Sequence, residues 1–254
     1  MSATTARVGL IIPSSNRMVE QEMARFFPPG VTLHVARLRM TGPHHVALDA
    51  LLPRIEEATR TLTDAKCDVV AFHCTATSME EGMAGEERVL AAVARAGAPK
   101  VTSTATAIRR AFDALGARRI VLVTPYSAKT TAEEAEFLHA AGCEVVHAVG
   151  HALAGSDAYC AAPPAFWRDS TLQAARREAE AYLVSCANIA AMSVLDELER
   201  RLEAPVITSN QAVLWDALVR IGNEDMSACP GRLFATDGGR VSQRRSPPLE
   251  EVRK

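Results

Sequence analysis

Two cysteines occupy matching positions in a chain that repeats itself, and they are the residues best suited to chemistry. Cys74 follows an apolar run over residues 69–72, and Cys186 follows a similar run over residues 181–184. A thiolate is a nucleophile, and a thiol can also supply or withdraw a proton. Two thiols on opposite walls of one cleft could therefore process a small carboxylic acid from both sides. A single cysteine at a strand end is usually inert packing, so the hypothesis depends on the repeat.

The other cysteines and the histidines show no pattern of their own. No two cysteines form a C-x-x-C pair, so neither a disulfide framework nor a zinc knuckle is expected. His73 directly precedes Cys74, but successive side chains of a strand point to opposite faces, which disfavours a Cys-His dyad. We predict no metal site and interpret the remaining cysteines as structural: Cys67, Cys143, Cys160 and Cys229.

Polar residues follow several of the predicted strands. In a parallel sheet, ligands bind beyond the carboxyl ends of the strands, where such residues come together. Each of them taken alone is a routine cap or turn residue. Arg39 could hold a carboxylate through two hydrogen bonds, although a solvated loop charge explains it equally well. The residues predicted to bind a carboxylate or an oxyanion are Ser14, Asn16, Thr75, Tyr126, Asn188 and Asn210.

Elements that alternate along the chain must position these side chains. Short apolar runs such as 8–12, 68–72 and 119–123 alternate with stretches of helical spacing, which predicts βαβ units and parallel sheets. The same number of residues separates Pro13 from Pro125 and Cys74 from Cys186, which indicates a duplicated α/β unit. We divide the chain into a half at 1–116, a half at 117–222, a closing segment at 223–236 and a disordered tail at 237–254.

Two segments carry local predictions. Residues 148–170 contain Gly150, Gly155, Pro163 and Pro164, which favours a long loop or lid. Apolar positions at helical spacing over 46–62 predict a helix, in which Pro53 is expected to cause a break or kink.

Composition limits the partners. The chain of 254 residues is 48% apolar and 23% charged with a formal net charge of −2, which is typical of a globular protein. This charge gives no reason to expect nucleic acid, and no apolar run is long enough to span a membrane. Without a secretory signal, we expect a cytoplasmic location.

Several motifs make the chain resemble a known group of enzymes. It resembles the aspartate/glutamate/hydantoin racemase superfamily, and within it the branch of maleate cis-trans isomerases and arylmalonate decarboxylases. The resemblance extends over residues 7–234. It implies two pseudo-symmetric Rossmann-like (flavodoxin-like) halves, each a mostly parallel four-stranded sheet flanked by helices, with the active site between them. It also implies no cofactor and, as is common for this architecture, a homo-oligomer. The motifs are Gly9 to Asn16, His73 to Ala76, Val123 to Tyr126, Val184 to Cys186, and Thr208 to Ala212 with Trp215.

The resemblance also implies roles. In the isomerases the cysteine that matches Cys74 attacks the alkene carbon, the one that matches Cys186 moves a proton, and the residues that match Asn16 and Tyr126 hold substrate carboxylates. The decarboxylases keep the second cysteine as proton donor but have glycine in place of Cys74 and a serine in place of Ala76. We therefore favour a two-cysteine isomerase or racemase of a small dicarboxylic acid, most like maleate cis-trans isomerase.

Other functions stay open at this point. A decarboxylase-like lyase would use Cys186 alone as proton donor. A non-catalytic carboxylate-binding module would use the same cleft with two ordinary thiols, and a redox pair would form a disulfide between them.

Overall fold

Two sheets of the same topology form the framework of the protein. The computed structural model describes residues 6–40, 46–223, 226 and 229–236. The first sheet has the strand order β2-β1-β3-β4 and the second has the order β6-β5-β7-β8, and all described pairings are parallel. The duplicated α/β architecture predicted from the sequence is confirmed. The strands are β1 (Ala6–Pro13), β2 (Val31–Leu38), β3 (Val69–Phe72), β4 (Val101–Ser103), β5 (Arg119–Thr124), β6 (Glu144–Gly150), β7 (Ala181–Val184) and β8 (Val206–Thr208).

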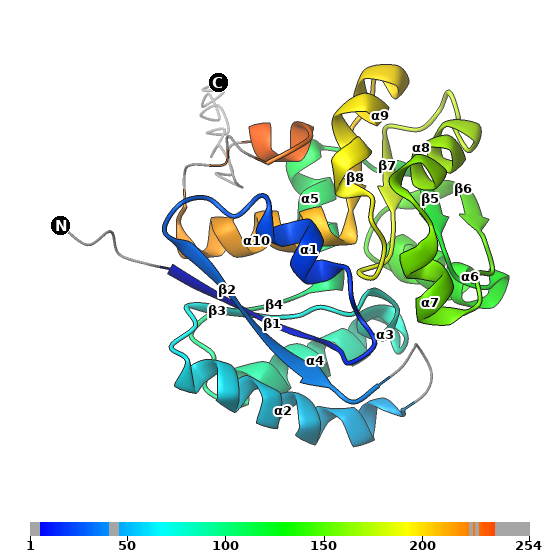
Figure 1. Cartoon of the computed structure of the whole chain (residues 1–254). Helices are drawn as coiled ribbons and strands as arrows, with labels where there is room; N and C mark the ends of the chain where they lie inside the picture. Colours follow the sequence, from blue (N-terminus) through cyan, green and yellow to red (C-terminus); the bar gives the residue numbers. More distant parts are fainter. Residues whose placement is uncertain (1–5, 41–45, 224–225, 227–228, 237–254) are drawn as a thin grey trace, which may run out of the picture.

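Helices cover the faces of both sheets (Figure 1). The central strands β3 and β7 are apolar and buried along their whole length, as expected for parallel strands with both faces covered. The helices are α1 (Val19–Ala24), α2 (Leu48–Asp64), α3 (Thr75–Met79), α4 (Gly82–Arg95), α5 (Thr104–Leu115), α6 (Ala128–Ala140), α7 (Gly155–Ala161), α8 (Pro164–Gln173), α9 (Leu195–Leu202) and α10 (Ser209–Ile221), with short 3₁₀ helices at η1 (Met192–Val194) and η2 (Arg232–Ala235).

The last long helix, α10, joins the two halves. It follows β8 of the second sheet, yet it packs against β3 and β4 of the first sheet and against α5. Figure 1 shows it lying over the first sheet, on the side opposite α2 and α4. One apolar cluster consequently runs through both halves, from Val8 and Leu10 of β1 to Leu183 of β7 and Leu214 of α10. This shared core fixes the orientation of one half relative to the other.

Two local predictions need correction. The segment 148–170 is largely helical rather than a long loop, because α7 and α8 form there. Helix α2 also continues through Pro53. The carbonyl that Pro53 leaves unpaired belongs to Asp49 in the exposed first turn, where water can replace the missing donor. Buried Leu51 and Ile55 hold this part of α2 in the core.

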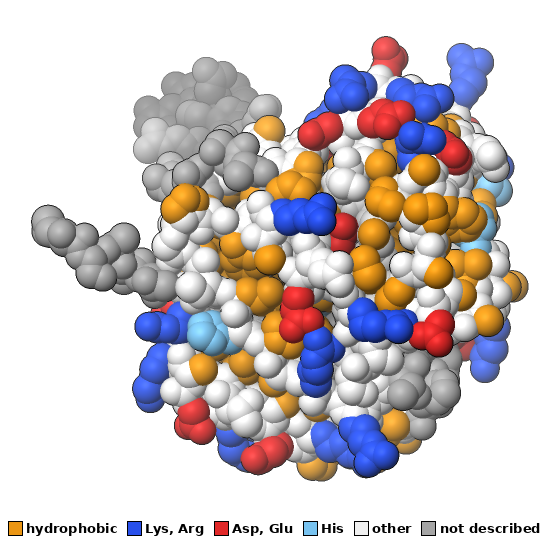
Figure 2. Space-filling model, viewed as in Figure 1, with side chains coloured by type: hydrophobic (Ala, Val, Ile, Leu, Met, Phe, Trp, Pro, Cys, Tyr) orange, Lys and Arg blue, Asp and Glu red, His pale blue; other side chains and the backbone are white. Residues whose placement is uncertain are grey.

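The described surface carries charges of both signs. On the face shown in Figure 2, acidic and basic side chains are interspersed, in keeping with the formal net charge of −2. Among the described helices, none combines the length and the apolar character needed to cross a bilayer. The predicted tail at 237–254 lies outside the described residues.

Candidate active site

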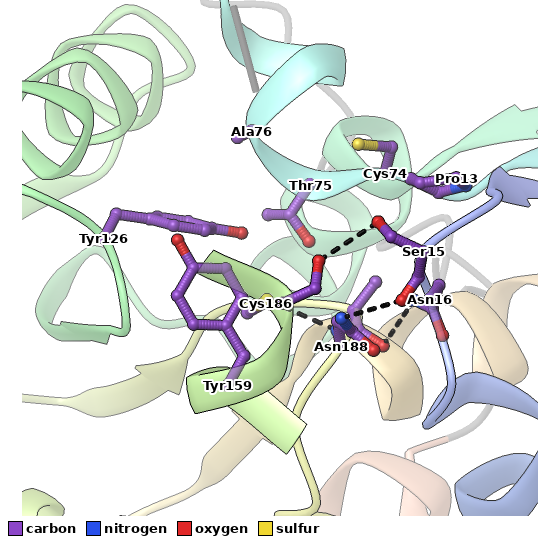
Figure 3. Close-up of a pocket in the computed structure, with 12 residues that line it drawn as sticks. Pro13, Ser15, Asn16, Cys74, Thr75, Ala76, Tyr126, Tyr159, Cys186 and Asn188 are labelled. Atoms are coloured by element: carbon purple, nitrogen blue, oxygen red, sulfur yellow. Dashed lines mark hydrogen bonds between the residues drawn. The ribbon is translucent and has the colours of Figure 1, made fainter. Parts of the chain in front are cut away.

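A pocket lies between the two halves, beyond the carboxyl ends of β1, β3, β5 and β7. It contains about 390 Å³ of empty space, its mouth included. The first half contributes the residues that follow β1 and the start of α3, and the second half contributes the residues that follow β5 and β7 together with α7 (Figure 3). The lining residues are Pro13, Ser15, Asn16, Cys74, Thr75, Ala76, Tyr126, Ser156, Tyr159, Cys186, Ala187 and Asn188.

Cys74 lies at the N-cap of α3, where the chain changes from extended to helical conformation. Its thiol donates to the Thr77 hydroxyl over 3.3 Å. Burial raises the pKa of the Cys74 thiol, whereas hydrogen bonds from the side chain and backbone of Thr77 lower it. The overall direction is upward, so Cys74 is a neutral thiol at pH 7.

Cys186 lines the same pocket from the second half. Its sulfur accepts the backbone N–H of Asn188 over 3.3 Å and is hydrogen-bonded to the Tyr126 hydroxyl. Burial nevertheless raises the pKa of Cys186 to about 12. Backbone amides at the start of a helix or loop would by themselves favour a thiolate at both positions. In the folded protein the pKa of both thiols is raised instead. The free-energy cost of removing a thiolate from water exceeds the stabilisation that these few hydrogen-bond donors provide.

Two tyrosines form one side of the pocket. The rings of Tyr126 and Tyr159 meet edge to face, with centroids 5.9 Å apart and planes inclined at 75°. Burial raises the pKa of Tyr126 and raises that of Tyr159 to about 12. Both phenols therefore stay protonated and can donate hydrogen bonds to a carboxylate or an enediolate oxygen. Gly150 makes room for this arrangement, since a Cβ atom there would lie 2.9 Å from the carbonyl oxygen of Tyr126.

The opposite side consists of hydroxyl and amide groups (Figure 3). The Asn16 amide donates to the carbonyl of Ala187 over 3.0 Å, and its oxygen accepts the backbone N–H groups of Met18 and Val19 at the start of α1. The second N–H of the Asn16 side chain remains available for a ligand. Asn188 accepts the backbone N–H of Arg17 over 2.9 Å. These contacts tie the loop after β1 to the loop after β7, so both asparagines also shape the pocket.

A short helix closes the pocket beside these asparagines. Ser156 of α7 donates to the hydroxyl of Ser15 over 3.0 Å. Arg17 pairs with Asp157 of the same helix over 2.6 Å, but both side chains are largely exposed, so this pair contributes little to stability.

Six of the predicted site residues come together in the pocket: Cys74, Cys186, Asn16, Thr75, Tyr126 and Asn188. Three others do not line it. The exposed Ser14 hydroxyl donates to the carbonyl of Met40, Arg39 is exposed just beyond β2, and the Asn210 side chain is buried against His73. The His73 ring is hydrogen-bonded to Thr104 and Asn210, each over 2.9 Å, away from the pocket.

Sequence reasoning missed Tyr159, Ser156 and Glu134. The two residues of α7 fall in the segment expected to be a lid, but nothing in the repeat marked them individually. Glu134 is buried on α6 and accepts a hydrogen bond from the hydroxyl of Ser185, next to Cys186. Burial raises the pKa of Glu134 from 4.5 to about 7. Only its position inside the fold distinguishes Glu134 from half-buried Glu133 and exposed Glu136 of the same helix.

The donor set of the pocket suits a small carboxylic acid more than a metal ion. Phenols, amides and hydroxyls converge on two thiols, which is appropriate for binding carboxylates and for stabilising negative charge on a carbon acid. Within the described ranges, no group of three or more histidine, cysteine or acidic residues could hold a metal ion.

Comparisons with known proteins agree with this chemistry. The family model for arylmalonate decarboxylase matches residues 8–234. The arylmalonate decarboxylase of Bordetella bronchiseptica is 28% identical over 236 residues, covering 91% of this chain and 98% of that protein. The maleate isomerase of Geobacillus stearothermophilus is 27% identical over 229 residues, covering 84% and 90%.

Solved structures of both kinds of enzyme have the same fold. A mutant maleate cis-trans isomerase of Nocardia farcinica with a covalently bound succinylcysteine intermediate superimposes with a TM-score of 0.84 at 25% identity, over 91% of this chain and 98% of that one. A liganded double mutant of arylmalonate decarboxylase gives a TM-score of 0.80 at 27% identity, over 91% and 99%.

Proposed function

The chain belongs to the arylmalonate decarboxylase family, whose model spans residues 8–234, and we propose that it is a cofactor-independent two-cysteine isomerase of a small dicarboxylic acid, of the maleate isomerase type. The observation that carries the proposal is the presence of Cys74 and Cys186 in one pocket, one from each half. The Nocardia relative with its succinylcysteine intermediate supports covalent addition of a cysteine to such a substrate within this fold.

The reaction starts from the thiolate of Cys74. Because burial raises the pKa of this thiol, its proton must first pass to a base, and the incoming dicarboxylate brings one. The sulfur then forms a bond to one alkene carbon, and the π electron pair moves toward the carboxylate of the other carbon, forming an enediolate. Hydrogen bonds from the phenol of Tyr126 and from the amides of Asn16 and Asn188 would stabilise this charge.

Cys186 completes the cycle. Its thiol delivers a proton to the enediolate carbon, which leaves a succinyl group on Cys74 and a thiolate at Cys186. Rotation about the new single bond exchanges the cis for the trans arrangement. Cys186 then withdraws a proton, the double bond re-forms, and the electron pair of the carbon–sulfur bond returns to Cys74, which recovers its proton from the carboxyl group of the product. No atom or electron is gained or lost overall.

A decarboxylase is the second candidate, favoured by the family model and by the Bordetella relative. In that reaction Cys186 would protonate the carbanion that remains after carbon dioxide has departed, and Cys74 would have no covalent role. The Ala76 side chain supplies no hydroxyl at the position where we expect the decarboxylases to have one. This difference places the isomerase first.

Proton NMR in deuterium oxide separates the candidates. Maleate, an arylmalonate, an alkylmalonate and aspartate would each be incubated with the protein, and with Cys74→Ala, Cys186→Ala and the control Cys143→Ala, which removes a buried thiol that does not line the pocket. We expect conversion of maleate to fumarate, abolished in the first two variants and kept in the control. Decarboxylation that survives Cys74→Ala but not Cys186→Ala would establish the lyase instead.

Turnover of none of these acids, together with saturable binding of one of them, would favour the non-catalytic module. A cytoplasmic location and a homo-oligomeric state, both expected from the sequence, remain predictions.

A further inference from the structure

The first two residues of α10, Ser209 and Asn210, contact the segments that carry the two cysteines. We propose that Ser209 is a positioning residue: it holds the side of the pocket that contains Cys74 (the Cys74 wall) and the side that contains Cys186 (the Cys186 wall) at a fixed separation. Ser209 itself does not line the pocket. The proposal rests on the proposed function, in which both thiols act on one substrate. It adds a residue that acts through the backbone and through Thr75.

Ser209 forms a hydrogen-bonded bridge between the two halves. Its hydroxyl oxygen accepts the backbone N–H of Cys186 over 3.1 Å. The same oxygen accepts the hydroxyl of Thr75 over 2.9 Å, and Thr75 directly follows Cys74. Ser209 and Thr75 are both almost completely buried. A single side chain therefore connects the peptide of one cysteine to the neighbour of the other.

Asn210 reinforces the Cys74 side of this bridge. Its side-chain oxygen lies 2.9 Å from Nε2 of His73, which directly precedes Cys74. Burial lowers the pKa of His73 to about 4, so the ring is neutral and its Nε2–H donates to Asn210. The residues on both sides of Cys74 are consequently held by α10, an element of the other half.

The fold explains why these two positions have this role. Helix α10 begins at the end of β8 but packs over the first sheet, so its N-terminus lies where the halves meet. The hydroxyl of Thr208 already caps the helix by accepting the N–H of Gln211 over 3.0 Å. The Ser209 hydroxyl is therefore not needed for capping, and its bonds run to the two walls instead.

Ser209→Ala removes the bridge with the loss of one oxygen atom. It leaves the N–H of Cys186 buried without its partner and releases Thr75, so both walls can shift. Misplacement of reacting groups by about 1 Å can lower a rate by about 100-fold. We expect kcat to fall about 10- to 100-fold while KM changes less than about threefold, since the groups of Asn16, Tyr126 and Asn188 that are proposed to hold the substrate charge are not bonded to Ser209.

Rates of alkylation by iodoacetamide, measured by peptide mass spectrometry at Cys74 and at Cys186 separately, report on the walls without any substrate. We expect both rates to rise at least about threefold in Ser209→Ala, because the loops that bury the thiols loosen. Ser209→Thr, which keeps the hydroxyl, should restore both kcat and the alkylation rates toward those of the wild type. The matched control is Ser170→Ala, which removes another buried serine hydroxyl, one bonded to His151 and not to the pocket.

A lower melting temperature in Ser209→Ala with unchanged kcat and unchanged alkylation at both cysteines would reduce Ser209 to an ordinary stabilising contact and overturn the proposal. Equal changes in the Ser170→Ala control would do the same. If the wild type turns over none of the tested acids, the proposed function fails by itself, and the alkylation rates alone decide the role of Ser209.

Discussion

Replacement of Glu134 by glutamine tests whether the buried carboxyl beside Cys186 is protonated in the folded protein. One oxygen of Glu134 accepts a hydrogen bond from Ser185, and the other is buried without a hydrogen-bond partner in the described part of the chain. Glutamine has the same shape and can still accept the bond from Ser185. The substitution therefore removes the titration and little else.

The size of the effect follows from the pKa. Burial raises the pKa of Glu134 from 4.5 in the unfolded chain to about 7 in the folded protein. Between these values the native state binds more protons than the unfolded state, so the free energy of unfolding falls as pH rises. At about 1.4 kcal/mol for each pH unit, the loss reaches about 3 kcal/mol above pH 7. Glu134→Gln has no carboxyl group at this position, so its free energy of unfolding does not undergo this loss.

Urea unfolding of both proteins at pH 4.5, 6 and 8 measures the difference. We expect Glu134→Gln to gain about 3 kcal/mol relative to the wild type between pH 4.5 and pH 8, with most of the gain by pH 7. His73 has the opposite effect, because burial lowers its pKa from 6.5 to about 4 and the folded protein loses stability as pH falls through this range. His73 is present in both proteins and cancels in the difference. A difference that does not vary with pH would refute the assignment of a protonated Glu134.

Three other predictions concern the pocket. Tyr126→Phe should lower kcat by about 100-fold, as loss of one oxyanion donor does, and steady-state kinetics on an identified substrate would contradict this if kcat stayed within threefold. Gly150→Ala should lower both the melting temperature and kcat, because the new Cβ would lie 2.9 Å from the carbonyl oxygen of Tyr126; an unchanged melting curve would contradict that close approach. Alkylation of Cys186 by iodoacetamide at pH 7.5 should be slower than that of a free thiol, because burial raises its pKa to about 12, and an equal or faster rate would contradict the neutral thiol.

The sequence predicted the architecture because the determining signals were local and repeated. Apolar runs such as 69–72 and 181–184 are too uniform for half-exposed strands, and their common spacing revealed the duplication. The identical strand order of the two sheets confirms it. The division at residue 116 stays a prediction, and α10 complicates it by packing against the sheet of the other half.

The site was predicted where a residue lies within a few positions of the end of a strand. Cys74, Tyr126 and Cys186 could be placed by that rule, because parallel strands end at a common edge. Ser14 and Asn210 satisfy the same rule, but the turn after β1 exposes the first and the start of α10 buries the second against His73. Tyr159 reaches the pocket from α7 through tertiary packing alone, which no local pattern records.

The direction of the thiol pKa values could not have been predicted either, because it depends on burial and not on sequence position. This direction bears on how the two cysteines divide the work. Cys186 lies near Glu134 and near the Tyr126 phenol, and its pKa of about 12 makes the thiol a reluctant acid and its thiolate a strong base. Such a group suits proton transfer to and from a carbon next to a carboxylate, because the C–H group of that carbon is itself a weak acid.

Cys74 has a different environment, although it occupies the matching position in the other half. Its charged form is stabilised by the hydroxyl and the backbone N–H of Thr77 within the helix that Cys74 begins, whereas the donors to Cys186 are the Tyr126 hydroxyl and the N–H of Asn188. Cys186 is followed instead by a loop, with no helix before η1. Duplication thus supplied two equivalent sulfur positions, and we propose that the different segments that follow them adapt one to covalent addition and the other to proton transfer. If this is correct, Cys74→Ser should mainly impair formation of the covalent adduct, whereas Cys186→Ser should mainly impair exchange of substrate protons with solvent. Mass spectrometry measures the first effect, and NMR in deuterium oxide measures the second.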